Sequence, residues 1–126
     1  MVSDFRNKKL NILLSPEDDL SNTFNNILSE IKNVSFYAYD KTYNILIIFT
    51  DKKIEFIYID DDKIKHCVVP YKTIQRWSYE LNEYPRKVNT QDMFLEIHSN
   101  DLHLSFTTKN KDQLVNIVSC LEQYVL

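Results

Sequence analysis

Short apolar runs separated by polar turns fill most of this chain. Between residues 35 and 107 the runs are strand-sized and end at Asp, Asn or Pro, as is typical of strands joined by tight turns. The pattern predicts a short helical turn at 71–73 and a polar loop at 82–90. It also predicts seven strands, at residues 35–39, 44–50, 54–59, 64–69, 74–81, 93–99 and 102–107.

An amphipathic helix is predicted to close the chain over residues 110–126. Asn110 is a favourable N-cap, and Gln113 follows at the spacing of a capping box. The apolar stripe of this helix consists of Leu114, Ile117, Val118, Leu121 and Val125. Strands followed by one C-terminal helix indicate a mainly β (α+β) fold, a small barrel or sandwich closed at one end.

A second helix is predicted near the N-terminus, over residues 16–32. Ser15 and Pro16 have the order of an N-cap and a first helical residue. The apolar stripe that follows consists of Leu20, Phe24, Ile27, Leu28 and Ile31. Residues 1–14 are expected to form a loose arm, and residues 15–126 a single domain.

The hairpin formed by residues 44–50 and 54–59 is predicted to be apolar on both faces. With Asp51 and Lys52 as the turn, one face pairs Phe49 with Ile54, Ile47 with Phe56, and Ile45 with Tyr58. The other face carries Leu46, Ile48, Ile57 and Ile59. A sheet that faces water on one side alternates apolar and polar residues. We therefore expect this second face to be covered by the N-terminal helix or by another copy of the chain.

Composition narrows the classes of function. The chain of 126 residues contains no glycine, which excludes the glycine-dependent phosphate and dinucleotide loops and the nucleophile elbow of hydrolases. The net charge is −3, and the basic residues are scattered among acids, so nucleic acid is not an expected partner. No signal peptide or membrane-length apolar run is evident, and we expect a soluble cytoplasmic protein.

Glu96, His98 and His103 form the one constellation with metal-binding chemistry. Across a two-residue turn at 100–101, the two histidines face each other in a non-hydrogen-bonded pair, with Glu96 on the same outer face. An exposed polar face is the favoured explanation of the pattern, and no metal or other cofactor is predicted. Cys67 and Cys120 lack a CxxC spacing and are expected to be free thiols.

Two segments resemble the bacterial pleckstrin-homology (PH) domain family. They are Phe49–Ile54 (FTDKKI) and Val69–Ile74 (VPYKTI), followed by a strand that carries Trp77. The family has a TNKR-type turn, an IPY-x-x-I step and a strand with an aromatic residue. Leu95, Ile97, Phe106 and residues 121–126 are similar to the last hairpin and helix of the family. The resemblance covers roughly residues 44–126 and implies a seven-stranded PH-like barrel closed by a C-terminal helix.

The resemblance further implies a non-enzymatic domain that often forms homo-oligomers. We expect an interaction module that binds itself or another protein, through the second hairpin face or an exposed strand edge. The expected interface residues are Leu46, Ile48, Ile57, Ile59, Tyr84 and Tyr124. The alternative is a peptide- or lipid-binding adaptor that uses loops 40–43 and 82–90 at the open end of the barrel. The first of these loops offers one Lys beside an Asp, so phosphoinositide binding is not expected.

Overall fold

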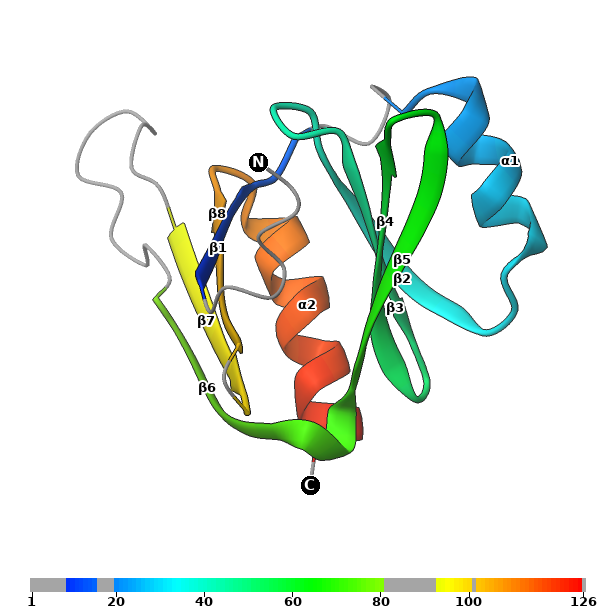
Figure 1. The fold of residues 1–126 in the computed structure, drawn as a ribbon. Coiled ribbons are helices and arrows are strands. Elements are labelled where there is room, and N and C mark those ends of the chain that lie inside the picture. Colours follow the sequence, from blue (N-terminus) through cyan, green and yellow to red (C-terminus); the bar gives the residue numbers. More distant parts are fainter. Residues whose placement is uncertain (1–8, 16–19, 81–92, 101, 126) are drawn as a thin grey trace.

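The computed structural model describes residues 9–15, 20–80, 93–100 and 102–125. Two four-stranded sheets face each other, and α2 lies between them (Figure 1). The first sheet has the strand order β1-β8-β7-β6 and the second has the order β2-β3-β4-β5. The elements are β1 (Lys9–Leu13), α1 (Asn22–Glu30), β2 (Val34–Asp40), β3 (Ile45–Thr50), β4 (Lys53–Asp60), β5 (Lys63–Pro70), the 3-10 turn η3 (Tyr71–Thr73), β6 (Ile74–Glu80), β7 (Met93–Ser99), β8 (Leu102–Thr108) and α2 (Lys111–Tyr124).

The main core lies between the two sheets. Alternate residues of each strand point inward, and α2 adds its apolar stripe to them. Its largest fully buried side chains include Phe49, Phe56, Phe106, Ile12 and Leu95. The seven predicted strands, the turn at 71–73 and the closing helix are confirmed within one or two residues, and the mainly β sandwich is the expected fold class.

The β3–β4 hairpin has the predicted register. Ile45 lies opposite Tyr58, Ile47 opposite Phe56, and Phe49 opposite Ile54. Both faces are buried, as the apolar pattern required. The second face packs against α1 in a separate cluster (Figure 1), which contains Phe24, Tyr39, Leu46, Ile48 and Ile57. Of the two expected covers, the structure has the N-terminal helix.

The expected loose arm at residues 1–14 is wrong for residues 9–13. These residues form β1, which pairs in parallel with β8, from Lys9 opposite His103 to Leu13 opposite Thr107. Leu10 and Ile12 point into the core and are buried. These two buried side chains and the ladder to β8 hold this short segment in place, although Lys9 and Asn11 are polar. The two paired strands are more than 90 residues apart in the sequence.

The N-terminal helix begins later than predicted. Ser21 is the N-cap of α1, and its side chain accepts the backbone N–H of Phe24. Ser15, the predicted N-cap, instead donates its backbone N–H to the carbonyl of Tyr39 at 2.7 Å and forms a bridge with β2. This contact places Ser15 at the edge of the β2-β3-β4-β5 sheet, and α1 begins only after Ser21. Residues 16–19 lie outside the described residues.

The N-terminus of α2 confirms one half of the predicted capping box. The side chain of Asn110 accepts the backbone N–H groups of Asp112 and Gln113. The Gln113 side chain does not return to Asn110. It accepts a hydrogen bond from Thr108 and donates one to the carbonyl of Ser15 at 2.9 Å. The helix is therefore tied to the segment that follows β1.

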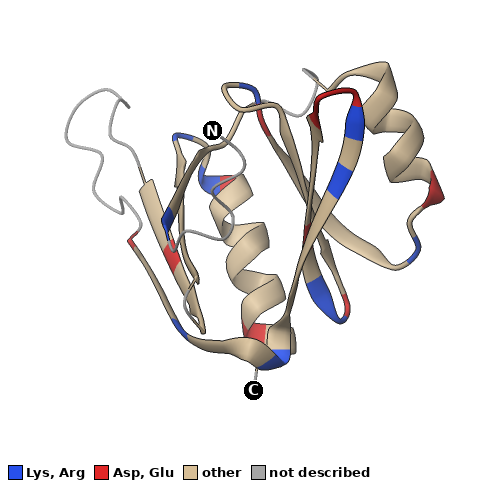
Figure 2. Cartoon of the chain, in the orientation of Figure 1, with Lys and Arg blue, Asp and Glu red and all other residues tan. Residues whose placement is uncertain are grey.

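Surface charge is mixed over the described part of the chain. Lys and Arg segments lie among Asp and Glu segments on both sheets (Figure 2). Among the described residues, no helix is long and apolar enough to cross a membrane.

Candidate functional site

The expected hairpin interface is mostly covered by the chain itself. Leu46, Ile48 and Ile57 are fully buried beneath α1, so their selection as interface residues is corrected: a partner can reach them only if α1 leaves. Ile59 is different, because 40% of it is exposed. Tyr84 lies outside the described residues.

The exposed apolar surface of this sheet lies next to α1, along its edge strand. Ile64 and Val68 of β5 are 49% and 45% exposed. Ile64 pairs with Ile59 in the β4–β5 ladder, and His66 pairs with the covered Ile57. Because side chains alternate along a strand, Ile59, Ile64 and Val68 share the outer face of the sheet.

Sequence reasoning missed Ile64 and Val68. Their alternation with Lys63, Lys65 and Cys67 was a signal that they share a face. The signal that β5 is an edge strand is topological: after Pro70 the chain enters β6, which belongs to the other sheet.

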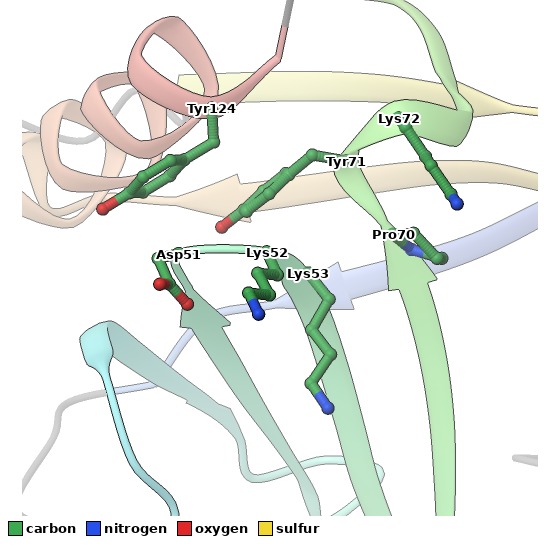
Figure 3. Close-up of a pocket in the computed structure, with 7 residues that line it drawn as sticks. All are labelled: Asp51, Lys52, Lys53, Pro70, Tyr71, Lys72 and Tyr124. Atoms are coloured by element: carbon green, nitrogen blue, oxygen red, sulfur yellow. The ribbon is translucent and has the colours of Figure 1, made fainter.

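Tyr124, the remaining expected contact residue, is half-buried and belongs to a pocket at the end of α2. Its ring stacks on the ring of Tyr71, with centroids 5.3 Å apart, and its hydroxyl lies 3.3 Å from that of Ser35. The pocket has a volume of about 480 Å³ (Figure 3). It is lined by Asp51, Lys52, Lys53, Pro70, Tyr71, Lys72 and Tyr124.

The two segments that carry the family resemblance meet in this pocket. The backbone N–H of Tyr71 donates to the carbonyl of Lys52 at 3.1 Å, and its hydroxyl donates to the carbonyl of Thr50 at 2.8 Å. Thr50 in turn accepts the backbone N–H groups of Lys52 and Lys53. Burial raises the pKa of Tyr71 well above its ordinary value, so the phenol stays protonated as a donor. These motif residues thus join the β3–β4 turn to η3, where the chain passes from one sheet to the other.

The open end of the barrel, expected to bind a peptide or lipid, is only partly described, because residues 81–92 lie outside the described residues. In its other loop, Asp40 is fully buried and ties β2 to β1. Its carboxylate accepts the backbone N–H groups of Leu13 and Tyr43, both at 3.1 Å. Burial raises the pKa of Asp40 in spite of these hydrogen bonds, which act in the opposite direction. Asp40 therefore holds the fold together instead of facing a ligand.

The Glu96–His98–His103 constellation forms as predicted. His98 lies opposite His103, and the two rings stack with centroids 4.2 Å apart. The ligand atoms of all three residues lie within 4.8 Å of one another on the outer face of the β1-β8-β7-β6 sheet. Burial, His103 and Arg76 lower the pKa of His98, whereas Glu96 raises it.

Neither cysteine is placed for chemistry. Cys67 and Cys120 are free thiols, as expected, and burial raises the pKa of both. Cys67 packs against the core from β5, whereas the histidine pair lies on the outer face of the other sheet. His66, the neighbour of Cys67, points to the opposite face of the strand, and the core lies between Cys67 and the His98–His103 pair. Within the described residues no histidine is therefore placed as a base for this thiol.

Comparison with solved structures supports the fold. A crystal structure of a DUF1696 family protein with a pleckstrin-homology domain, from Shewanella loihica PV-4, is similar to this chain with a TM-score of 0.59. The two share 18% sequence identity, and the match covers 92% of this chain and 98% of the other. No family model matches the sequence, and no curated protein does. The chain therefore has a PH-like fold, as the resemblance implied.

Proposed function

We propose that this chain is a non-catalytic PH-like interaction module that binds a second copy of itself along β5. The PH-like fold generally serves interaction rather than chemistry, which supports the first half of the proposal. The observation that carries the second half is an eight-residue edge strand whose outer face exposes Ile64 and Val68 on either side of His66.

The backbone of β5 offers hydrogen bonds to another strand. Within the described residues, β5 pairs with β4 alone. Asp60 lies opposite Lys63 across a two-residue turn, which makes every second position from Lys63 a hydrogen-bonded pair with β4. The backbone N–H and C=O groups of Ile64, His66 and Val68 therefore point to the edge of the sheet, where a further strand can pair with them.

A two-fold pairing centred on His66 suits the side chains. In this antiparallel register, Ile64 lies opposite Val68 of the second copy, and the same contact repeats on the other side of the axis. Ile59 of each chain lies beside this apolar cluster, because it pairs with Ile64 within the chain. The contact continues the four-stranded sheet into an eight-stranded one.

The charges of β5 permit this register. Lys65 lies opposite Cys67 of the second copy and Lys63 opposite Val69, so no two lysines face each other directly. At the axis His66 meets His66 of the second copy, and each lies beside Glu55 of its own chain. Lys65 is also engaged within its own chain, since its Nζ lies 3.0 Å from a carboxylate oxygen of Asp60. Because the fit is reciprocal, the occupant that this edge suits best is a copy of the same edge.

Backbone hydrogen exchange as a function of protein concentration tests the pairing. The amides of Ile64, His66 and Val68 are expected to gain protection as concentration rises, because they become bonded only in the dimer. The amides of Lys65 and Cys67 are bonded to β4 at every concentration and serve as internal controls. Protection of the first three amides that does not depend on concentration would overturn the β5 pairing.

A second candidate function is recognition of an acidic peptide in the pocket of Figure 3. Lys52, Lys53 and Lys72 line this pocket together with Asp51 and the stacked rings of Tyr71 and Tyr124. Such a lining favours a carboxylate next to an apolar or aromatic residue. An acidic peptide should then bind wild type better than a Lys52→Gln/Lys72→Gln variant, and a neutral peptide of the same length should bind neither.

A further inference from the structure

We propose that Glu96, His98 and His103 bind a zinc ion on the outer face of the β1-β8-β7-β6 sheet. The site is separate from β5 and from the pocket of Figure 3, and its ligands come from β7 and β8. Both strands are internal to the sheet, so the ligands stand on a rigid support rather than on a loop.

The register brings the three side chains together. His98 and His103 are directly opposite, one position from the turn that joins β7 to β8. With Ser99 and Leu102 as the hydrogen-bonded pair next to that turn, the histidines form a non-hydrogen-bonded pair, in which side chains lie closest. Glu96 is two residues before His98 and therefore on the same face.

The distances are within reach of one ion. All three ligand atoms lie within 4.8 Å of one another, and ligand atoms about 2.0–2.2 Å from a tetrahedral zinc are about 3.3 Å apart. Rotation about the side-chain bonds is enough to close this difference. The stacked rings, with centroids 4.2 Å apart, already place both imidazoles on one side of the hairpin.

His103 shows a second feature that points to a ligand. Its Nε2 atom is buried and has no hydrogen-bond partner among the described residues. The atom lies 3.4 Å from Oε1 of Glu96, but without the geometry of a hydrogen bond. A buried nitrogen normally has a partner, and a metal ion shared with Glu96 would give it one.

The donor set selects the kind of ion. Two imidazoles and one carboxylate suit zinc and related transition metals, whereas magnesium and calcium prefer oxygen ligands. Three protein ligands leave the fourth tetrahedral position for water.

The neighbouring charges oppose the ion in part. Arg76 pairs with His98 from β6, and Lys9 pairs with His103 from β1. Both cations are exposed, so water and salt screen their repulsion. Replacing Arg76 with Gln is therefore expected to strengthen zinc binding, by about threefold.

Thermal unfolding of the full chain with zinc sulfate tests the site. Zinc is expected to raise the Tm by about 5 °C, and EDTA should reverse the rise. His98→Ala and His103→Ala should each abolish the shift, and Glu96→Gln should weaken binding about tenfold. Glu80→Gln is the matched control for Glu96→Gln, because Glu80 is an exposed carboxylate of the neighbouring strand β6, opposite Phe94, and should leave the shift unchanged.

A measurement independent of stability uses the imidazole NMR signals. At each zinc concentration the signals of His98 and His103 should shift by the same fraction of their full change, because both residues bind one ion. The signals of His66 should not shift. The absence of any zinc-induced shift in wild type would overturn the proposal. Equal Tm shifts in wild type, His98→Ala and His103→Ala would overturn it as well, because the ion would then bind elsewhere.

Discussion

The outer faces of the two sheets contrast in what covers them. On the β2-β3-β4-β5 sheet, Leu46, Ile48 and Ile57 are fully buried beneath α1. On the β1-β8-β7-β6 sheet, the corresponding face carries Glu96, His98 and His103, and α2 lies on the other side of that sheet. An apolar outer face demands a cover, whereas an alternating one can face water and is free to bind other molecules.

The covered face is not covered completely. α1 reaches Leu46, Ile48 and Ile57, but Ile59 and the outward residues of β5 remain exposed. The sheet thus combines a helix-protected centre with an unprotected edge. This edge is where we place the contact with a second copy.

The largest effect is expected when the cover is weakened. Phe24 of α1 is fully buried, and its ring packs edge-on against that of Tyr39, with centroids 5.9 Å apart. Phe24→Ala should therefore lower the free energy of unfolding by about 3–5 kcal/mol. Phe94→Ala, on the open face, where Phe94 is 43% exposed, should lower it by only about 0.5 kcal/mol. Equal losses in urea unfolding would contradict the contrast between the two faces.

A smaller loss of stability is expected when Asp40, which connects the two sheets, is replaced. Asp40→Ala leaves the backbone N–H groups of Leu13 and Tyr43 without their carboxylate and should cost about 1–3 kcal/mol. Because burial raises the folded-state pKa of Asp40 above 3.8, the protonated group stabilises the fold below that pH. This contribution is lost as pH rises through the folded-state pKa.

The pH dependence of the Asp40→Ala variant shows which form of Asp40 the folded state favours, the protonated carboxyl group or the carboxylate. The stability difference between wild type and Asp40→Ala should be largest at and below pH 3.8 and should decrease as pH rises through the folded-state pKa. Urea unfolding at a series of pH values measures it. A difference that grows with pH would show that the folded state lowers the pKa instead.

The sequence predicts those parts of the fold that local pattern determines. The β3–β4 register follows from alternation and a two-residue turn, and the need for a cover follows from apolar residues on both faces. The position of α1 was misplaced because Ser15–Pro16 has a strong local signature, while Ser15 actually pairs with Tyr39. β1 was missed because its partner β8 lies far away in sequence.

The candidate sites also differ in whether local sequence pattern predicts them. The histidine pair could be predicted because it depends only on a hairpin turn and strand alternation. The β5 edge could not, because edge position depends on the order of strands across the whole sheet. Nor could the pocket of Figure 3, since its two turns and Tyr124 meet only in three dimensions.

Replacing the N-cap of α1 is expected to lower the free energy of unfolding by about 1 kcal/mol. Ser21→Ala removes the acceptor for the backbone N–H of Phe24, now at 3.3 Å, and N-cap replacements of this kind cost about that much. Ser29→Ala is the control within α1, because the Ser29 hydroxyl donates to the carbonyl of Asn26 at an exposed position. Thermal unfolding should separate the two variants, and equal Tm values would show that the cap contributes nothing.

The smallest effect on stability is expected when His98, on the open face, is replaced in the absence of metal. His98→Ala in the presence of EDTA should change the free energy of unfolding by no more than about 0.5 kcal/mol, because the imidazole is only half-buried and its ring contact is with His103 on the same outer face. A loss several times larger in urea unfolding would mean that the histidine pair serves the fold and not a ligand.

The solution mass of the chain tests self-association most directly. Light scattering over a range of concentrations should give a mass that rises from that of the 15.1 kDa chain to twice that value. The variant Ile64→Lys/Val68→Lys should stay at the single-chain mass, and Leu13→Lys/Phe94→Lys, with two exposed residues of the other sheet, should behave like wild type. A wild-type mass of 15.1 kDa at every concentration would contradict the proposed dimer.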